Sequence, residues 1–203
     1  MNDLNVKDTL ALDTLPGIKK IVLLERTTST QEVARELAFQ GGMEGTLVLA
    51  LTQEAGKGRM GRTWESGRGG IYMTLILEPS IGLKFLTELS LLAGRVAADT
   101  LKQLYGLTTR VKLPNDVYAL HPQKNKYFKI AGILTETSSI NKTPNWILLG
   151  VGVNLNNAVS LDTGISVSGI LKKEVPREEF LQAFFENFWH IYSAWEYSSE
   201  SKS

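Results

Sequence analysis

The sequence predicts an α+β fold in which helices flank a mixed β-sheet. Helix-like and strand-like segments mix irregularly, without the steady β–α–β rhythm that predicts a purely parallel sheet. The composition is that of a globular protein, with 43% hydrophobic and 21% charged residues. A chain of 203 residues buries roughly 70% of its unfolded surface, which is enough for a full hydrophobic core. We therefore expect one large domain over residues 18–197.

The domain is expected to follow a weakly ordered lead-in, residues 1–17. Residues 18–25 (IKKIVLLE) read as its first strand. The segment Thr28-Ser29-Thr30 then offers hydroxyl groups that can cap a helix over 31–40, where apolar residues recur at helical spacing. The pair Gly41-Gly42 ends that helix.

Two strands, at 45–52 and 70–78, flank a polar, glycine-rich loop. A long amphipathic helix over 83–105 comes next and ends at Gly106. Further strand-like segments lie at 108–112, 117–120, 127–137 and 146–153. A short helix is expected at 166–172.

The last helix has Pro176 in its first turn. Large apolar side chains recur along it every three to four residues, at Phe180, Phe184, Phe188, Ile191 and Trp195. This stripe predicts core packing rather than a cofactor site. The polar tail, residues 198–203, is expected to be disordered.

Composition and charge exclude several classes of function. The net charge is +1, so no broad attraction to nucleic acid or to a membrane surface is expected. The absence of cysteine excludes disulfides and thiolate nucleophiles, and two isolated histidines, His121 and His190, are too few for a typical zinc site or Ser-His triad. No apolar run reaches membrane-spanning length, and the N-terminus does not resemble a signal peptide. We expect a cytoplasmic protein.

The most informative segment is the loop from Gly56 to Gly70, which holds six of the chain's 18 glycines. Glycine allows the backbone to approach a ligand closely, and guanidinium groups match phosphate oxygens in geometry. The basic residues of the loop are Lys57, Arg59, Arg62 and Arg68. This combination indicates nucleotide or phosphate chemistry, against the plainer alternative of a solvated hairpin loop.

The spacing Gly56-x-Gly58-x-x-Gly61 formally matches a dinucleotide-binding fingerprint. That fingerprint requires a helix directly after the glycines, whereas a second strand-like segment follows this loop. A Rossmann site is therefore rejected. No kinase signature accompanies the loop, and no Walker A sequence is present.

Three further segments have polar or flexible residues where a site could form. Residues 112–116 (KLPND) favour a turn that exposes an ammonium, an amide and a carboxylate. Lys129 begins an otherwise apolar strand, either as an edge-strand solubility device or as an ammonium directed at developing negative charge. Gly150 and Gly152 alternate along a strand and form a flat surface against which a ligand can lie.

In this order, the segments resemble those of the biotin–protein ligases, also called biotin-[acetyl-CoA-carboxylase] synthetases. That family shows Ser-Thr-Asn, GRGRxGRxW, KWPND, KxAGIL and GxGxN. The matching segments here are Ser29-Thr30-Gln31, GKGRMGRTW, KLPND, KIAGIL and GVGVN, within a resemblance that covers about residues 20–197. The resemblance implies the biotin–lipoate ligase catalytic fold, which is similar to that of class II aminoacyl-tRNA synthetases.

The resemblance also implies an ATP-dependent reaction in two steps. Biotin and Mg²⁺-ATP give biotinyl-5′-AMP and pyrophosphate, and the biotinyl group then passes to one lysine of a biotin carboxyl carrier domain. The implied biotin-binding residues are Ser29, Thr30, Gln31, Gln53, Gly56, Lys57, Lys129, Gly132, Gly150 and Gly152. Those implied for ATP or AMP are Arg59, Arg62, Trp64, Lys112, Asn115, Asp116 and Asn154. The implied catalytic residues are Lys129, Arg59, Lys57 and Asp116, with Asp116 also a candidate Mg²⁺ ligand.

The chain departs from the family pattern at several positions. Lys57 stands where arginine is usual, Gln31 where asparagine is usual, and Leu113 where tryptophan is common. We expect no helix-turn-helix region before the domain and no SH3-like barrel after it. The partners implied are a carrier domain of a biotin-dependent carboxylase, biotin and ATP, with the chain a monomer or a homodimer.

Two other functions stay open at this point. Lipoate–protein ligases and octanoyltransferases share the fold, but a ureido head needs polar partners that a dithiolane or alkyl chain does not. The full GKGRMGRTW segment and the GVGVN strand favour biotin. A non-catalytic module that binds biotin or biotinyl-AMP is the alternative from another class. Lys112, Asn115, Asp116 and Lys129 together argue against it.

Overall fold

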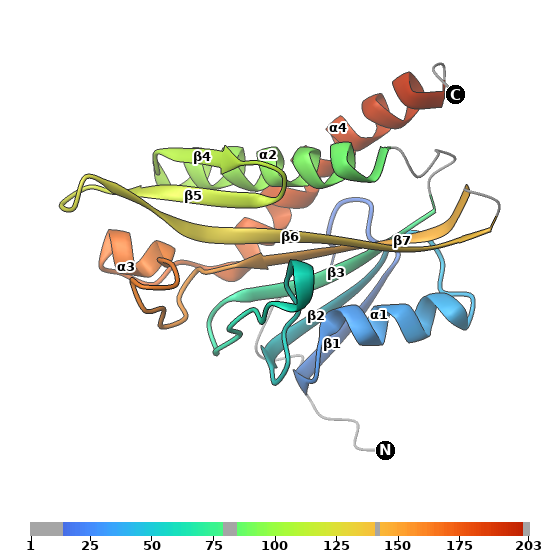
Figure 1. Cartoon of the computed structure of the whole chain (residues 1–203), viewed down its shortest axis with the longest axis horizontal. Helices are drawn as coiled ribbons and strands as arrows, with labels where there is room; N and C mark the ends of the chain where they lie inside the picture. Colours follow the sequence, from blue (N-terminus) through green and yellow to red (C-terminus); the bar gives the residue numbers. More distant parts are fainter. Residues whose placement is uncertain (1–13, 79–84, 141–142, 201–203) are drawn as a thin grey trace.

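A computed structural model describes residues 14–78, 85–140 and 143–200 (Figure 1). The strands are β1 (Lys20–Thr27), β2 (Thr46–Gln53), β3 (Ile71–Leu77), β4 (Thr109–Lys112), β5 (Asp116–His121), β6 (Lys126–Ile140) and β7 (Thr143–Val153). The helices are α1 (Thr30–Phe39), the single 3-10 turn η1 (Arg59–Gly61), α2 (Leu86–Tyr105), α3 (Val167–Leu171) and α4 (Arg177–Glu200). This arrangement confirms the α+β class.

The seven strands form one mixed sheet in the order β1-β2-β3-β7-β6-β5-β4. β1 and β2 are parallel because the chain crosses back through α1 between them. All other neighbours are antiparallel. The chain reverses direction through the glycine-rich loop between β2 and β3, so that loop lies at the end of the central strands.

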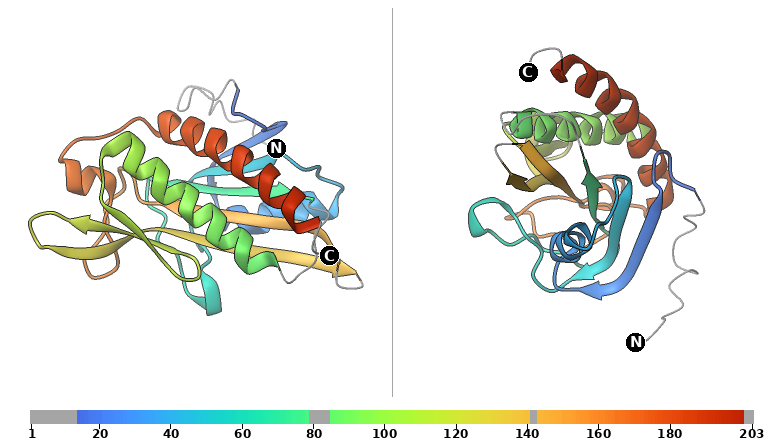
Figure 2. Two further views of the ribbon diagram at one scale, coloured as in Figure 1. Left: turned by 90° about the horizontal axis from the view of Figure 1, so that it is seen from above. Right: turned by 90° about the vertical axis from the view of Figure 1, so that its right-hand side faces the viewer.

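Helices α2 and α4 pack side by side over one face of the sheet (Figure 2). The main hydrophobic core lies beneath them, and it includes Leu49, Leu75 and Val96, each at most 2% exposed. The predicted stripe of the last helix supplies much of this core through Phe180, Phe184 and Phe188, which are all buried, whereas Ile191 of the same stripe is exposed. In the described chain, no helix has the length and apolar character needed to cross a membrane.

Helix α1 packs on the opposite face of the sheet, where it contacts β2, β3 and β7. Its buried residue Ala34 joins Val48, Ile76 and Leu148 in a second, smaller core. Strands β4, β5 and β6 contact α2 on the first face. Within the described residues, the β4–β5 end of the second face has no helix over it (Figures 1 and 2).

The observed strands and helices match the predicted ones, with ends shifted by a few residues. β6 and β7 are longer than expected because their ladder continues to the pair Ile140–Thr143. The long helix ends at Gly106 with φ +65°, as predicted, whereas the predicted residues 83 and 84 lie outside the described chain. Most of the expected lead-in, residues 1–13, lies outside it too.

The predicted disordered tail, residues 198–203, needs a correction. Helix α4 continues to Glu200, so the first three of these residues are helical. Each added residue of an established helix gains a backbone hydrogen bond, which favours extension past the last core contact. Residues 201–203 lie outside the described chain.

Replacing Phe188 by alanine is expected to lower the free energy of unfolding by about 3–5 kcal/mol. Phe188 is fully buried, and its ring stacks between Phe184 and Tyr192. Ile191 is on the same helix but 40% exposed, so Ile191→Ala serves as a matched control that should cost about 1 kcal/mol. Urea denaturation followed by circular dichroism measures both. Equal losses would contradict this account of the core.

Candidate functional site

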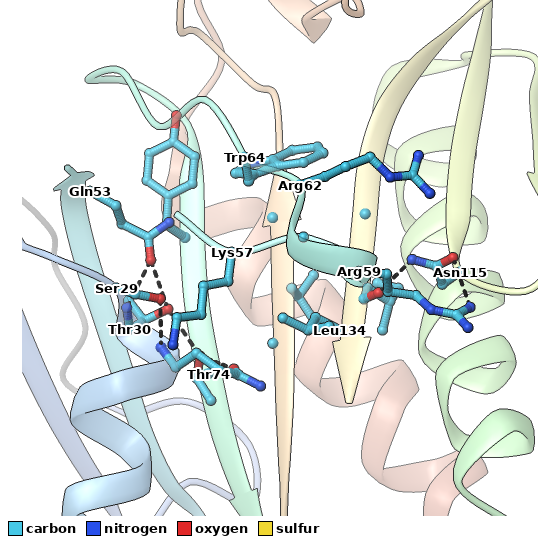
Figure 3. Close-up of a pocket in the computed structure, with 18 of the residues that line it drawn as sticks. Ser29, Thr30, Gln53, Lys57, Arg59, Arg62, Trp64, Thr74, Asn115 and Leu134 are labelled. Carbon is cyan, nitrogen blue, oxygen red and sulfur yellow. Dashed lines mark hydrogen bonds between the residues drawn. The ribbon is translucent and has the colours of Figure 1, made fainter. Parts of the chain in front are cut away.

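A cavity of about 120 Å³ opens between the N-terminus of α1, the glycine-rich loop and the facing surfaces of β3, β5, β6 and β7 (Figure 3). Fourteen of the seventeen residues singled out from the sequence line it. They are Ser29, Thr30, Gln31, Gln53, Lys57, Arg59, Arg62, Trp64, Asn115, Asp116, Lys129, Gly132, Gly150 and Gly152. Gly56, Lys112 and Asn154 do not.

One end of the cavity is a polar network where α1 meets β2. Ser29 caps α1, and its hydroxyl oxygen accepts from the backbone N–H of Gln31 at 3.3 Å. Thr30 donates to Gln53 Oε1 from both its backbone N–H (2.8 Å) and its hydroxyl (3.1 Å). The Gln53 amide nitrogen in turn donates to the Ser66 hydroxyl at 2.8 Å. These bonds fix hydroxyl and amide groups around the cavity in set orientations.

Thr74 belongs to this network, and sequence reasoning missed it. Its hydroxyl is fully buried and lies 2.9 Å from both Thr30 Oγ1 and Gln31 Oε1. The available signal was one hydroxyl residue in the otherwise apolar centre of β3. Gln31 Oε1 also lies only 2.7 Å from the position of a Cβ atom on Gly150. A side chain at residue 150 would therefore displace the Gln31 amide from its contact with Thr74.

The glycine-rich loop forms a small ordered hairpin. The backbone N–H of Trp64 donates to the Gly56 carbonyl at 2.8 Å, and the backbone N–H of Gly58 donates to the Arg62 carbonyl at 2.7 Å. Met60 has φ +58° at the tip of this hairpin, where its side chain is 89% exposed. A Cβ atom on Gly56 would lie 2.4 Å from the Trp64 carbonyl oxygen, so Gly56 allows the hairpin to close rather than lining the cavity.

Two side chains connect the hairpin to opposite walls of the cavity. Lys57 Nζ lies 2.8 Å from Glu32 Oε1 on α1, and Glu32 also accepts from the Thr28 hydroxyl at 2.7 Å. The hydrogen bond from Lys57, followed by that from Thr28, holds the pKa of Glu32 below its usual value. On the other side, Arg59 donates to Asn115 Oδ1 at 3.3 Å. Figure 3 shows Lys57 directed toward Ser29 and Thr30, away from Arg59.

Lys129 and Asp116 form an ion pair of 2.7 Å at the β5–β6 side of the cavity. Their side chains are 25% and 20% exposed, so the pair is only partly solvated. A register shift between Val117 and Tyr118 positions Lys129: Val117 pairs with Ala131, Tyr118 pairs with Lys129, and Ile130 is skipped. This bulge turns Lys129 onto the cavity face while Ile130 and Ala131 stay in the core.

The Trp64 indole lies on the glycine surface of β6 and β7. A Cβ atom added to Gly132 would lie 3.0 Å from this ring, and one added to Gly152 would lie 2.6 Å from it. Lys129 Nζ lies 5.1 Å from the centroid of the Trp64 ring and makes a cation–π contact with it. The flat surface expected from the alternating glycines is therefore present, and the indole covers part of it. The Trp64 Nε1–H is buried and has no partner in the described chain.

The residues outside the main cavity have defined places. A second cavity of about 130 Å³ adjoins the first and shares Trp64 and Lys129 with it. Asn154 lines that second cavity, where its side-chain oxygen accepts from Asn157 at 2.9 Å. Lys112 is exposed, and its ammonium lies 5.4 Å from the centroid of the Tyr118 ring.

The carboxylates give limited support for a metal ion. Asp116 is the one carboxylate among the described residues that line the main cavity. No group of three or more His, Cys, Asp or Glu residues able to hold a metal occurs in the described part of the chain. Mg²⁺ commonly binds through one or two carboxylates together with substrate phosphates, so Asp116 fits such an ion only with ligand oxygens beside it.

Comparisons with known proteins agree with this geometry. The family model described as Biotin/lipoate A/B protein ligase family matches residues 23–154, which is more than half of the chain. The chain is 40% identical over 130 residues to the bifunctional ligase/repressor BirA of Bacillus subtilis (strain 168), across 64% of this chain and 38% of that protein. It is 36% identical over 169 residues to the biotin–[acetyl-CoA-carboxylase] ligase of Paracoccus denitrificans, across 78% of this chain and 67% of that one.

Among solved structures, the chain resembles the biotin protein ligase from Aquifex aeolicus in complex with biotin and ATP. The TM-score is 0.76 at 27% identity, and the match covers 90% of this chain and 74% of that one. The chain spans well under half of the Bacillus subtilis protein. The family model nevertheless covers most of the sheet and the residues that build the main cavity. This chain therefore belongs to the biotin/lipoate A/B protein ligase family.

Proposed function

We propose that the chain activates biotin with ATP as biotinyl-5′-AMP and transfers the biotinyl group to a lysine of a biotin carboxyl carrier domain. One observation carries the proposal: the Lys129–Asp116 pair and the polar network around Gln53 line the same cavity. A fixed polar network suits an uncharged ureido head, and a partly desolvated ammonium suits a carboxylate that reacts at phosphorus. The Aquifex aeolicus relative with a matching fold holds biotin and ATP.

In the first step, a biotin carboxylate oxygen bonds to the α-phosphorus of ATP, and the bond from that phosphorus to the bridging oxygen breaks to release pyrophosphate. Such reactions depend on positioning and on neutralising charge more than on covalent help from the protein. Lys129 lines the cavity in which that charge would develop, and Arg59 and Arg62 add two guanidinium groups to the lining of the same cavity. Mg²⁺ bound with Asp116 would neutralise phosphate charge.

In the second step, the ε-amine of the carrier lysine bonds to the carbonyl carbon of the mixed anhydride. The bond to the AMP oxygen then breaks, AMP leaves, and the amine loses a proton as the amide forms. Lys129 donates toward the carbonyl and phosphate oxygens, where negative charge increases again. Asp116 holds the Lys129 ammonium in place through their 2.7 Å contact.

Pyrophosphate release tests the proposal directly. With Mg²⁺-ATP, we expect release with biotin but not with lipoate or octanoate, because only biotin carries a polar head for the network at Thr30 and Gln53. Sustained release should require a carrier domain, which should become labelled on one lysine. Activation of lipoate in preference to biotin would establish a lipoate ligase. Biotin binding without any pyrophosphate release would establish a binding module.

Lys129→Ala is expected to lower turnover by roughly 100-fold, the usual cost of losing a preorganised donor to a developing charge. Steady-state pyrophosphate release with carrier measures the change. Lys126→Ala is the matched control, since Lys126 is an exposed lysine on the same strand and lies outside the cavity. Near-normal turnover of Lys129→Ala would remove Lys129 from the mechanism.

Biotin and ATP together are expected to slow tryptic cleavage of the hairpin after Lys57, Arg59 and Arg62. The hairpin is held to the rest of the described chain by a few side-chain contacts, of Lys57 with Glu32, of Arg59 with Asn115 and of Trp64 with the glycines of β6 and β7, so ligand contacts should reduce its opening. Mass spectrometry of timed digests gives the rates, with cleavage at Lys124 in the β5–β6 turn as the internal control. Unchanged rates at the hairpin alone would show that it does not close on ligand.

A further inference from the structure

Where no described helix covers the sheet, the face formed by β4, β5 and the start of β6 carries a cluster of cationic and aromatic side chains that extends from the cavity. Arg110 pairs with Tyr118 across the β4–β5 ladder, and Tyr118 pairs with Lys129 across the β5–β6 ladder. Paired residues project to the same side of a sheet, so all three share the face on which Lys129 lines the cavity. Lys112 and Tyr127 lie over the same face, against Tyr118 and Arg110. We call Arg110, Lys112, Tyr118 and Tyr127 the basic face.

The basic face is positive although the chain as a whole is nearly neutral. Two of its four residues, Arg110 and Lys112, are cationic, and the segment from Leu107 to Thr135 that carries it has one acidic residue, against 21 in the whole chain. That acidic residue, Asp116, is already paired with Lys129. Arg110 and Lys112 are exposed, so their charge is available to a partner.

The cations are held in place over aromatic rings. The Arg110 guanidinium carbon lies 4.0 Å from the centroid of the Tyr127 ring, and Lys112 Nζ lies 5.4 Å from that of Tyr118. Such contacts restrict the side chains and leave their outer sides free to pair with carboxylates. They also cover the ring faces on which an unpaired base would need to stack. This favours an acidic protein surface over a nucleic acid.

The position of the basic face matches the geometry of the transfer step. Arg110 on β4 and Lys129 on β6 are separated by one strand, β5. At the usual distance between neighbouring strands, their backbones lie about 10 Å apart. An acceptor lysine carries its amine only a short distance from its own backbone. The protein that presents it at Lys129 must therefore rest on the rim of the cavity, where the basic face lies.

We propose that the basic face docks the acceptor protein of the transfer reaction through acidic side chains around its acceptor lysine. This inference rests on the proposed function, and it adds the surface and the charge by which the partner is recognised. Recognition by exposed charge acts mainly on the rate of encounter and weakens as salt screens it.

Arg110→Glu tests the proposal, with Lys126→Glu as the matched control. Both variants change the charge by the same amount, but Lys126 lies on the opposite face of β6, 5.4 Å from the Phe128 ring. The probe is an isolated biotin carboxyl carrier domain with acidic residues beside its lysine. Arg110→Glu should raise the KM for this domain about tenfold at low ionic strength, and Lys126→Glu should change it by less than about twofold. The difference should shrink as salt increases.

Activation is measured separately, as biotin-dependent pyrophosphate release without carrier. We expect the wild-type rate for Arg110→Glu, which also shows that the variant folds. An unchanged carrier KM in Arg110→Glu with activation intact would overturn the docking surface while leaving the proposed function standing. If the wild-type chain does not activate biotin, the proposed function fails. The docking surface is then judged by direct binding of the carrier domain, which Arg110→Glu must weaken.

Two further measurements complete the test. A carrier domain whose acidic residues beside the lysine are changed to amides should lose the difference between wild type and Arg110→Glu, and a persistent difference would contradict charge pairing. Binding of duplex and single-stranded DNA to wild type and Arg110→Glu is measured at the same ionic strength. Loss of DNA binding with unchanged carrier KM would assign the surface to nucleic acid and overturn the proposal.

Discussion

A single β-bulge between β5 and β6 determines where the central charge of this site lies. If Ile130 were paired in a regular ladder instead of being skipped, strict alternation would turn Lys129 toward the same side as the buried Ala131. A lysine facing the core would be costly, and the cavity would lack its ammonium. With the bulge, Lys129 faces Asp116 and Trp64, and the hydrophobic residues on either side keep their core contacts. The two adjoining cavities meet at this lysine.

The coverage of the sheet explains why a site can exist beside it. Helices α2 and α4 bury one face with large aromatic and aliphatic side chains, which supplies most of the core. Helix α1 covers only the β2–β3–β7 part of the other face. The remaining part carries polar residues: the basic face lies on it, and the cavity opens at its border with α1.

The glycine-rich hairpin connects the two walls of the cavity. Lys57 contacts α1 through Glu32, and Arg59 contacts the turn before β5 through Asn115. A single ammonium is sufficient for the monodentate contact with Glu32, which gives a structural role to the lysine found where arginine is usual. The hairpin thereby holds Trp64 against the glycines of β6 and β7.

The sequence by itself determined the mixed α+β class, the approximate ends of the strands and helices, and most of the residues that line the cavity. Those features depend on local signals: apolar spacing, capping hydroxyls, glycines and short motifs. It did not indicate Thr74, the contact of Lys57 with Glu32, or the position of Trp64 on Gly152, because each depends on segments far apart in the chain. The bulge at Ile130 and the shared face of Arg110, Tyr118 and Lys129 were likewise decided by strand register. Register is a property of paired strands, so only the tertiary structure determines it.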